Sequence, residues 1–329
     1  MEDYSLSLLE ILATAVARMG LIPEHIAVIM DGNRRYARSK GLKTIQGHQA
    51  GAAVSSRVDK WGRAVGCKEV TVYAFSSENF KRTKEEVDDL MELMCWKTDT
   101  MLQDVETGKI TDVSFNVIGD WDKVPHKLKC RMANLVEKTK NFKPYKLNVA
   151  VAYTGREGML RSLKAFEGLK CDETATEVNH NSDKGQTQQP KWNEYLVEQA
   201  QNMANMRPVD MLIRTGGDLR LSDFMLWEAS HAYVHFTPKT WPELSFSAFM
   251  HAIFMYQVHR RQIPKPISAK DSLSLEELRY TEKTLQGPRA VMWAKNARFA
   301  KKDAQVEKNR KPFYPSKTYL DSLQDLLSF

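Results

Sequence analysis

The chain has 329 residues, and 42% of them are hydrophobic, which is enough for the core of one large domain or two modest ones. No apolar run approaches the length that crosses a bilayer, and acidic residues precede the first apolar stretch, so we expect neither a membrane span nor a secretory signal. The four cysteines show no metal-ligand spacing and are predicted to be reduced thiols.

The net charge of +7 lies almost entirely in the last part of the chain. Residues 261–329 contain 14 Lys and Arg against 8 Asp and Glu, a net +6, which leaves +1 for residues 1–260. A compact nucleic-acid-binding domain normally carries a basic excess of its own, so we expect no nucleic-acid partner. The basic tail could meet RNA, an acidic partner or an anionic membrane, although most tails of mixed charge are simply solvated.

The first predicted element is an amphipathic helix within residues 5–19, which Gly20 ends. Its apolar face consists of Leu8, Leu9, Ile11, Leu12 and Val16. Such a face suits a membrane surface, and it suits docking on the protein core equally well. We treat residues 1–20 as a segment separate from the main domain.

Short apolar segments rich in β-branched residues follow, and stretches long enough for helices lie between them. The predicted strands are residues 25–30, 69–75, 113–118, 147–153 and 209–213. Strands that are apolar on both faces and alternate with helices predict an α/β fold with a central, mostly parallel sheet covered by helices on both faces. A further strand, residues 233–236, is expected at an edge of the sheet.

Other signals divide the chain further. The sequence Thr-Lys-Glu-Glu at residues 83–86 predicts a capping box that begins a helix. Residues 168–192 are polar and aperiodic, which predicts a disordered surface insertion. Residues 263–329 begin with two prolines and continue as charged helical pieces. We therefore expect a main domain over residues 21–262 and a charged helical extension after it.

The segment HIAVIMDGNRRYAR, residues 25–38, carries the strongest functional signal. A strand that ends in Asp-Gly-Asn before a helix lets backbone amides approach a phosphate group. Arg34 and Arg35 add charged donors, and Asp31 can hold a divalent metal that bridges phosphate oxygens. Asp-Gly and Asn are also ordinary turn formers, so a plain turn with solvated arginines is the alternative.

Polar residues cluster at three equivalent strand ends. They are Asp31, Asn33, Arg34 and Arg35 after the first strand, Ser76, Ser77, Glu78, Asn79 and Arg82 after the second, and Arg214, Thr215, Gly216, Gly217, Asp218, Arg220 and Ser222 after the fifth. Ligands bind at the carboxyl ends of strands in open parallel sheets. Two arginine-rich pockets with one acid predict two phosphate-bearing substrates and a metal. Neither a P-loop nor a GxGxxG motif follows the first strand.

The motifs HIAVIMDGNRRYAR, GHQAG, VTVYAFSSENFKR and IRTGGDLRLSDFMLW, in this order, closely resemble the cis-prenyltransferases, the undecaprenyl and dehydrodolichyl diphosphate synthases. The resemblance covers about residues 20–262. It implies repeated Mg²⁺-dependent condensation of isopentenyl diphosphate onto farnesyl diphosphate, which builds long Z-polyprenyl chains. For the dehydrodolichyl enzymes this serves dolichol biosynthesis and protein glycosylation.

The resemblance also implies roles for individual residues. Asp31 would hold Mg²⁺, while Gly32, Asn33, Arg34, Arg35 and Arg82 would surround the allylic diphosphate. Arg214, Arg220 and Ser222 would hold isopentenyl diphosphate. Asn33, His48, Ser76 and Asn79 would position substrate and help to remove the proton. The Met- and Leu-rich face of residues 87–102 is a candidate wall for the apolar tunnel that the product needs, or ordinary core.

Three departures separate this chain from the bacterial homodimeric enzymes. Tyr233 stands where those enzymes have a metal-binding glutamate, Thr44 stands where an arginine is expected, and no RxG follows Trp241. These departures resemble the eukaryotic catalytic subunit, which needs a Nogo-B receptor-like membrane partner to supply the RxG. We therefore expect peripheral association with the cytosolic face of the endoplasmic reticulum. A non-catalytic scaffold of the same fold is the alternative, but such subunits lose the Asp-Gly-Asn and SSEN residues that this chain keeps.

Overall fold

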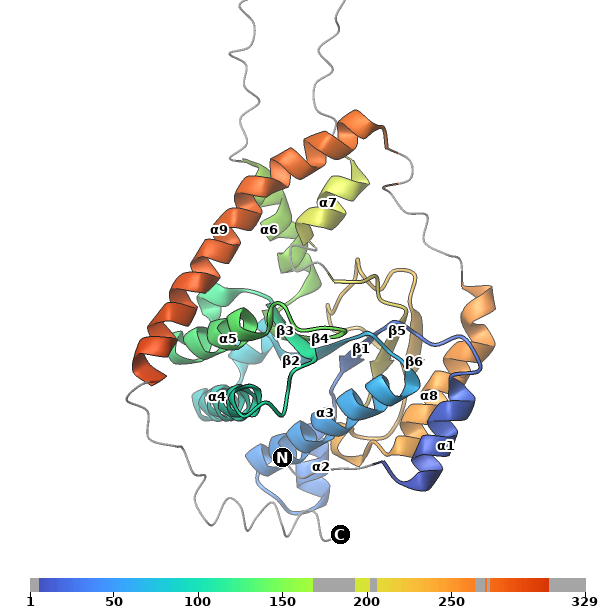
Figure 1. The fold of residues 1–329 in the computed structure, drawn as a ribbon. Coiled ribbons are helices and arrows are strands. Elements are labelled where there is room, and N and C mark those ends of the chain that lie inside the picture. Colours follow the sequence, from blue (N-terminus) through green and yellow to red (C-terminus); the bar gives the residue numbers. More distant parts are fainter. Residues whose placement is uncertain (1–5, 168–192, 202–205, 264–269, 271–272, 308–329) are drawn as a thin grey trace, which may run out of the picture.

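The chain folds around one sheet whose neighbouring strands all run parallel. The structure, a computed structural model, describes residues 6–167, 193–201, 206–263, 270 and 273–307 (Figure 1). Within these residues the strand order is β3-β4-β2-β1-β5-β6. The strands are β1 (His25–Ile29), β2 (Glu69–Ser76), β3 (Val113–Ile118), β4 (Tyr145–Tyr153), β5 (Met211–Arg214) and β6 (Tyr233–Phe236). The predicted α/β fold with a parallel sheet is confirmed, and so is the place of residues 233–236 at an edge.

Helices occupy the connections between the strands and cover the sheet. They are α1 (Leu8–Ala17), α2 (Asn33–Ser39), α3 (Thr44–Val65), α4 (Lys84–Glu106), α5 (His126–Thr139), α6 (Gly155–Glu167), α7 (Glu194–Gln201), α8 (Phe246–His259) and α9 (Leu275–Glu307). The main core lies between one face of the sheet and α3 and α8, with Trp61 and Phe249 among its fully buried side chains. The opposite face packs against residues 221–229, where Phe224 and Met225 are buried.

The start of α4 differs from the predicted capping box. The Thr83 hydroxyl accepts a hydrogen bond from the Glu86 backbone N–H at 3.3 Å, as expected of an N-cap. The Glu86 side chain does not return to Thr83, because it accepts a hydrogen bond from Arg82 Nη1 at 2.8 Å. The predicted reciprocal hydrogen bond of the capping box is therefore wrong, because the Glu86 carboxylate binds Arg82 instead.

The C-terminal extension is in part a component of the folded body. Helix α9 runs beside α5 and α7 (Figure 1). Asp303, on α9, is buried and accepts a hydrogen bond from Asn134 of α5 at 3.0 Å, and Lys129 of α5 stacks over the Phe299 ring. The predicted insertion at 168–192 and the end of the tail after residue 307 lie outside the described residues.

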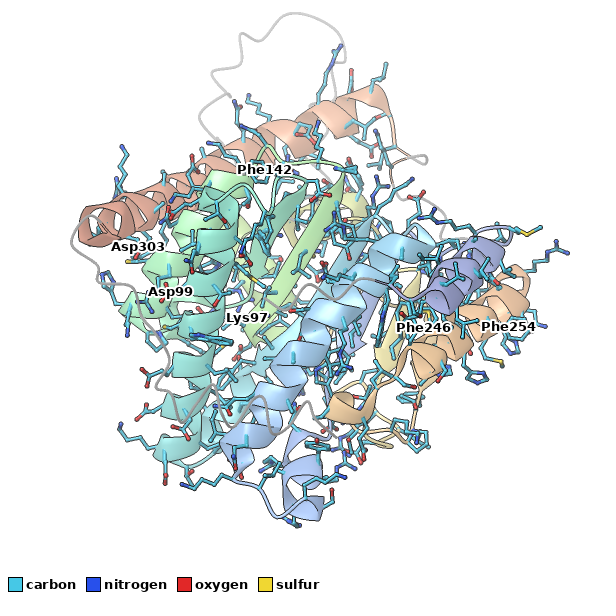
Figure 2. The ribbon with its side chains drawn as sticks, turned by 60° about the horizontal axis from the view of Figure 1, so that its bottom comes forward. Lys97, Asp99, Phe142, Phe246, Phe254 and Asp303 are labelled. Carbon is cyan, nitrogen blue, oxygen red and sulfur yellow. The ribbon has the colours of Figure 1, made fainter. Side chains whose placement is uncertain are left out.

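Helix α1 rests on α3 and α8 but turns most of its apolar side chains outward. Leu9 is 78% exposed and Val16 68%, whereas Thr14 and Ala17 are buried. On the neighbouring helix α8, Phe254 is also exposed, at the edge of the molecule beside α1 (Figure 2). Docking on the core thus accounts for one side of α1 only. None of the described helices combines the length and the apolarity that a membrane span requires.

Candidate active site

A cavity of about 1500 Å³ lies between α3 and α4, over the sheet. Its mouth is at the carboxyl ends of β1, β2 and β5, where the sequence analysis placed the polar clusters. Every predicted site residue lines it: Asp31, Gly32, Asn33, Arg34, Arg35, His48, Ser76, Asn79, Arg82, Arg214, Arg220 and Ser222. Residues almost two hundred positions apart in the chain therefore share one wall, because the parallel register pairs Ile29 of β1 with Arg214 of β5.

Glycine is required where β1 turns into α2. Gly32 has a φ of +101°, and a Cβ atom there would lie 2.7 Å from Thr240 Cβ. Its backbone N–H donates to Asp31 Oδ1 at 2.6 Å, which fixes the carboxylate at the end of the strand. Asp-Gly thus makes the turn that the plain interpretation expects and also places Asp31 at the cavity.

Arg214 lies at the centre of a charged cluster that we call the Arg214 cluster, made of Asp31, Arg35, Arg214, Asp218 and Arg220. The Arg214 side chain is only 3% exposed, and its Nη2 donates to Asp31 Oδ2 at 2.8 Å and to Asp218 Oδ2 at 3.3 Å. Arg35 reaches the same two carboxylates at 3.4 and 3.8 Å, and Arg220 reaches Asp218 at 2.8 Å. Burial raises the pKa of Asp31, but Arg214, the Gly32 N–H and Arg35 outweigh it and hold that pKa below its usual value. Asp31 is therefore ionised at neutral pH.

A second basic group lies at the start of α4. Glu86 binds Arg82 at 2.8 Å, and Arg34 and His48 Nε2 lie 4.0 and 3.9 Å from its carboxylate. Burial, with Arg82 and Arg34 adding positive charge, lowers the pKa of His48 to about 4. The imidazole is thus neutral at physiological pH. Only a capping role was expected for Glu86, because Arg82 lies before the start of α4 and the helical spacing rule does not pair the two residues.

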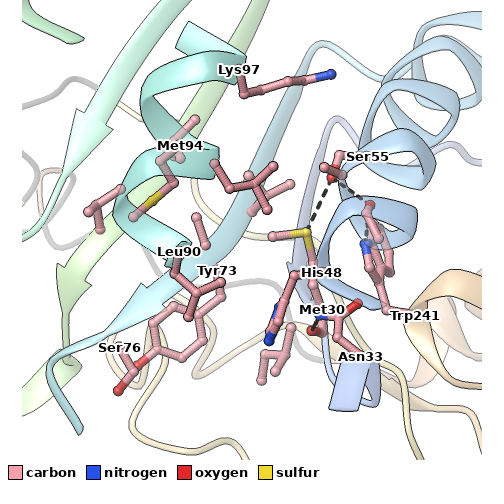
Figure 3. Close-up of a pocket in the computed structure, with 18 of the residues that line it drawn as sticks. Met30, Asn33, His48, Ser55, Tyr73, Ser76, Leu90, Met94, Lys97 and Trp241 are labelled. Carbon is pink, nitrogen blue, oxygen red and sulfur yellow. Dashed lines mark hydrogen bonds between the residues drawn. The ribbon is translucent and has the colours of Figure 1, made fainter. Parts of the chain in front are cut away.

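Three buried polar atoms at the mouth have no hydrogen-bond partner among the described residues. They are Asn33 Oδ1, His48 Nε2 and Arg214 Nε. A buried polar atom left unpaired costs about 1–3 kcal/mol, so three at one mouth point to a polar ligand that completes them. Asn33 and His48 lie close together beside Met30 and Trp241, as Figure 3 shows.

Ser76 and Asn79 are engaged with the backbone. The Asn79 side chain accepts from the Ser76 N–H at 2.9 Å, and the Ser76 hydroxyl accepts from the Glu78 N–H at 3.1 Å. They cap the short 3₁₀ helix Ser77–Lys81 and not the helix at 84, which Thr83 caps. Both still line the cavity, so their turn geometry presents them to whatever binds there.

The inner cavity is less apolar than the predicted tunnel wall. Leu90, Leu93, Met94 and Met101 of α4 line it, as expected, but so does Lys97, whose Nζ donates to Ser56 of α3 at 2.7 Å. Figure 3 shows the Lys97 side chain extending toward α3. Asp59 lines the same region, with Oδ1 unpaired among the described residues. The sequence of α4 alone does not reveal that Lys97 forms a hydrogen bond with Ser56 of α3.

The donor set suits a metal that arrives with its ligand better than a metal held by the protein alone. No group of three or more His, Cys, Asp or Glu in the described part of the chain is arranged to hold an ion. Mg²⁺, however, is commonly bound through one or two carboxylates together with substrate phosphates. Asp31 fits that arrangement. Tyr233 does not line the cavity and instead stacks on His259 of α8, with ring centroids 5.7 Å apart.

Comparison with known proteins agrees with this geometry. The model of the undecaprenyl diphosphate synthase family matches residues 29–264. The chain belongs to this family of cis-prenyltransferases. The human dehydrodolichyl diphosphate synthase complex subunit DHDDS is 33% identical over 309 residues, 94% of this chain and 88% of that protein. A geranylgeranyl-diphosphate-specific tritrans,polycis-undecaprenyl-diphosphate synthase of Thermoplasma volcanium is 35% identical over 73% of this chain and 88% of its own length.

A solved structure agrees as well. The lavandulyl diphosphate synthase of Lavandula x intermedia, in complex with dimethylallyl diphosphate, superposes with a TM-score of 0.60 and 28% identity. The match covers 72% of this chain and 95% of that one. The resemblance drawn from the motifs is confirmed at the level of family and fold. This cis-prenyltransferase is thus a prenyl-transferring enzyme, and the individual residue roles remain predictions.

Asp59 gives a prediction about pH and stability. Burial raises its pKa from 3.8 to about 6, so the folded state holds this proton more tightly than the unfolded state does. Stability should therefore fall as pH rises from about 4 to about 6, and the loss should persist above that range. Asp59→Asn should raise the melting temperature at pH 8, with a gain that shrinks toward pH 4. The exposed Asp88→Asn is the control. A lower melting temperature of Asp59→Asn at pH 8 would contradict this account.

Proposed function

We propose that this chain is the catalytic subunit of a dehydrodolichyl diphosphate synthase. It would add isopentenyl diphosphate repeatedly to farnesyl diphosphate, with Mg²⁺, and so supply the polyprenyl chain for dolichol and protein glycosylation. The observation that carries the proposal is the pair of basic groups, one around Arg82 and one around Arg214 and Asp31, that line one cavity of about 1500 Å³. The similarity to the human subunit over nearly the whole chain supports it.

The first diphosphate would bind at the end of β1. Arg34, Arg35 and Arg82 line that side of the mouth and supply charge-assisted donors. Asp31 would hold Mg²⁺ together with the diphosphate oxygens, and the ion would supply positive charge as the diphosphate departs. Departure of this group is the charge-separating step, so preorganised cations contribute most there.

The second diphosphate would bind at the end of β5. Arg214 is held from within by Ser222, whose Oγ accepts from Nη1 at 2.7 Å, while Arg220 is exposed at the cavity mouth. Asn33 and His48 line the same cavity. With a pKa of about 4, His48 is neutral at neutral pH, so one of its two ring nitrogens can accept a hydrogen bond. Such groups position a substrate and accept its proton transiently; a non-catalytic scaffold has no use for them.

Removing the charge of Asp31 tests its proposed role as the Mg²⁺ ligand. Asp31→Asn keeps the size of the side chain but should lower turnover on the order of 100-fold or more, since a metal-assisted departing group loses its protein anchor. Incorporation of labelled isopentenyl diphosphate measures it, with circular dichroism as the folding check. Asp88→Asn, on the exposed face of α4, is the control. Normal turnover in saturating Mg²⁺ would exclude Asp31 as the metal ligand.

A partner subunit would complete the site. No RxG follows Trp241, and Tyr233 points its ring at α8 rather than into the cavity. The similar human protein is named as a subunit of a complex. We propose a Nogo-B receptor-like partner that brings the RxG.

The purified chain should then be folded yet nearly inactive by itself. Adding the RxG-bearing partner should raise turnover by orders of magnitude, because each missing diphosphate contact costs a few kcal/mol in the transition state. Titrating the partner in the isopentenyl diphosphate assay measures the gain, and deleting its RxG should reverse it. Full activity of the homogeneous chain alone would refute the heteromer.

Peripheral binding to the cytosolic face of the endoplasmic reticulum would use α1. Helix α1 packs beside α8, and both helices carry exposed apolar side chains: Leu9 and Val16 on α1, and Phe254 on α8 (Figure 2). An apolar helix face of this kind inserts at the level of lipid headgroups. Docking on the core leaves these side chains without a partner in the described residues, so a lipid surface accounts for them better.

Vesicle flotation with Val16→Glu tests that surface. A buried charge among lipid tails is costly, so the variant should lose most of its vesicle binding while its melting temperature stays unchanged. Val291→Glu on α9 is a matched control, since Val291 is 69% exposed and Val16 68%. Equal flotation of both variants would exclude α1 as the membrane contact.

A further inference from the structure

The turn after Arg220 has an unusual backbone. Ser222, Asp223 and Met225 have φ values of +50°, +59° and +47°, although none of them is glycine. Such conformations crowd the Cβ atom and persist only where neighbouring groups hold them. This turn contains Ser222, which binds Arg214 Nη1, and it directly follows Arg220. The contacts that hold this turn therefore also set the geometry of the diphosphate subsite around Arg214 and Arg220.

Asp223 is the group that holds it. Its Oδ2 accepts from Arg156 Nε at 2.9 Å, its Oδ1 accepts from the Arg156 backbone N–H at 3.0 Å, and its carbonyl accepts from the Gly155 N–H. The Asp223 side chain is only 13% exposed. Both acceptor oxygens are thus bound to the first turn of α6, which begins after β4. The turn follows β5 in the sequence, but these hydrogen bonds connect it to the end of β4.

Phe224, the next residue of the turn, is fixed by packing against the sheet. The Phe224 ring stacks on the Tyr73 ring of β2, with centroids 4.3 Å apart, and is fully buried. The Tyr73 hydroxyl donates to the Tyr153 carbonyl at 2.9 Å, which fixes its ring. The same hydroxyl lies 3.4 Å from the Ser222 carbonyl, so Tyr73 supports the turn from the sheet. The Arg156–Asp223 pair connects the turn to α6 at the cavity, where both residues belong to the lining.

We propose that Arg156 and Asp223 form a positioning pair for the second diphosphate subsite, and that the pair keeps Ser222 and Arg220 turned toward the cavity. The proposal rests on the proposed function, since it assigns this subsite to isopentenyl diphosphate. The first subsite is built on α2 and on the start of α4, and neither Arg156 nor Asp223 contacts its arginines among the described residues. Loss of the pair should therefore weaken one substrate and spare the other.

The experiment compares Asp223→Ala, Arg156→Ala and the double variant in the assembled enzyme. The readouts are the KM for each substrate and the calorimetric Kd of isopentenyl diphosphate, both for the assembled enzyme. Asp223→Ala should raise the KM and the Kd for isopentenyl diphosphate about tenfold, and Arg156→Ala somewhat less because its backbone contact survives. The KM for farnesyl diphosphate should change less than about twofold. The double variant should be no worse than Asp223→Ala, since both changes remove one interaction.

Two further variants separate positioning from general destabilisation. Arg156→Lys keeps the charge opposite Asp223 and should restore much of the affinity that Arg156→Ala loses. Lys123→Ala removes a different basic partner of the same first turn of α6, the one bound to Glu157 at 2.7 Å, and should change neither KM. Melting temperatures verify that all variants are folded.

The outcomes are distinct. Equal rises in both KM values, or additive effects in the double variant, would overturn the positioning pair while leaving the proposed function intact. An unchanged Kd in Asp223→Ala would do the same. A wild-type enzyme that neither binds nor uses isopentenyl diphosphate would overturn the proposed function, and the pair with it.

Discussion

The geometry of the site depends on one buried cation. Arg214 has a side chain that is 3% exposed, and a charge in that position persists only when it is paired. Asp31 at the end of β1 and Asp218 in the loop after β5 supply the pairing. The sheet register makes this possible, because Arg214 lies directly beside Ile29. Each carboxylate ties its own loop to the same guanidinium, so the two loops that form the mouth are held together by the same interactions that concentrate charge there.

Other arginines at the mouth also have carboxylate partners in the structure. Glu86 pairs with Arg82, and Asp218 pairs with Arg220. Because these cations are held in place before any ligand arrives, little side-chain entropy is lost when a diphosphate replaces a carboxylate as their partner. The unpaired atoms of Asn33 and His48 belong to the lining of the same cavity. The site is thus preorganised both for charge and for hydrogen bonding.

The helices on the two sides of the molecule differ in the surface that they expose. Helix α9 covers α5 and α7 through buried and charged contacts, including Asn134 with Asp303, and leaves the cavity mouth uncovered. Helices α1 and α8 lie on the other side, next to the edge strand β6, and carry the exposed Leu9, Val16 and Phe254. The exposed apolar side chains of α1 and α8 are therefore separated along the sheet from the helix that covers α5.

The sequence predicted what local pattern encodes and missed what arises only between elements. Strand positions, the edge place of residues 233–236 and the meeting of the polar clusters follow from apolar runs and from the rule that ligands bind at strand ends. Glu86 was misjudged because its local role as a cap competes with Arg82, and a charge-assisted hydrogen bond is stronger than a cap. Lys97 and Asp59 face each other only once α3 and α4 are packed, so no spacing within one helix reveals them. The Arg156–Asp223 pair joins residues of two different strand ends, so no local pattern around either residue reveals it, and its sign is the strained backbone of the folded turn.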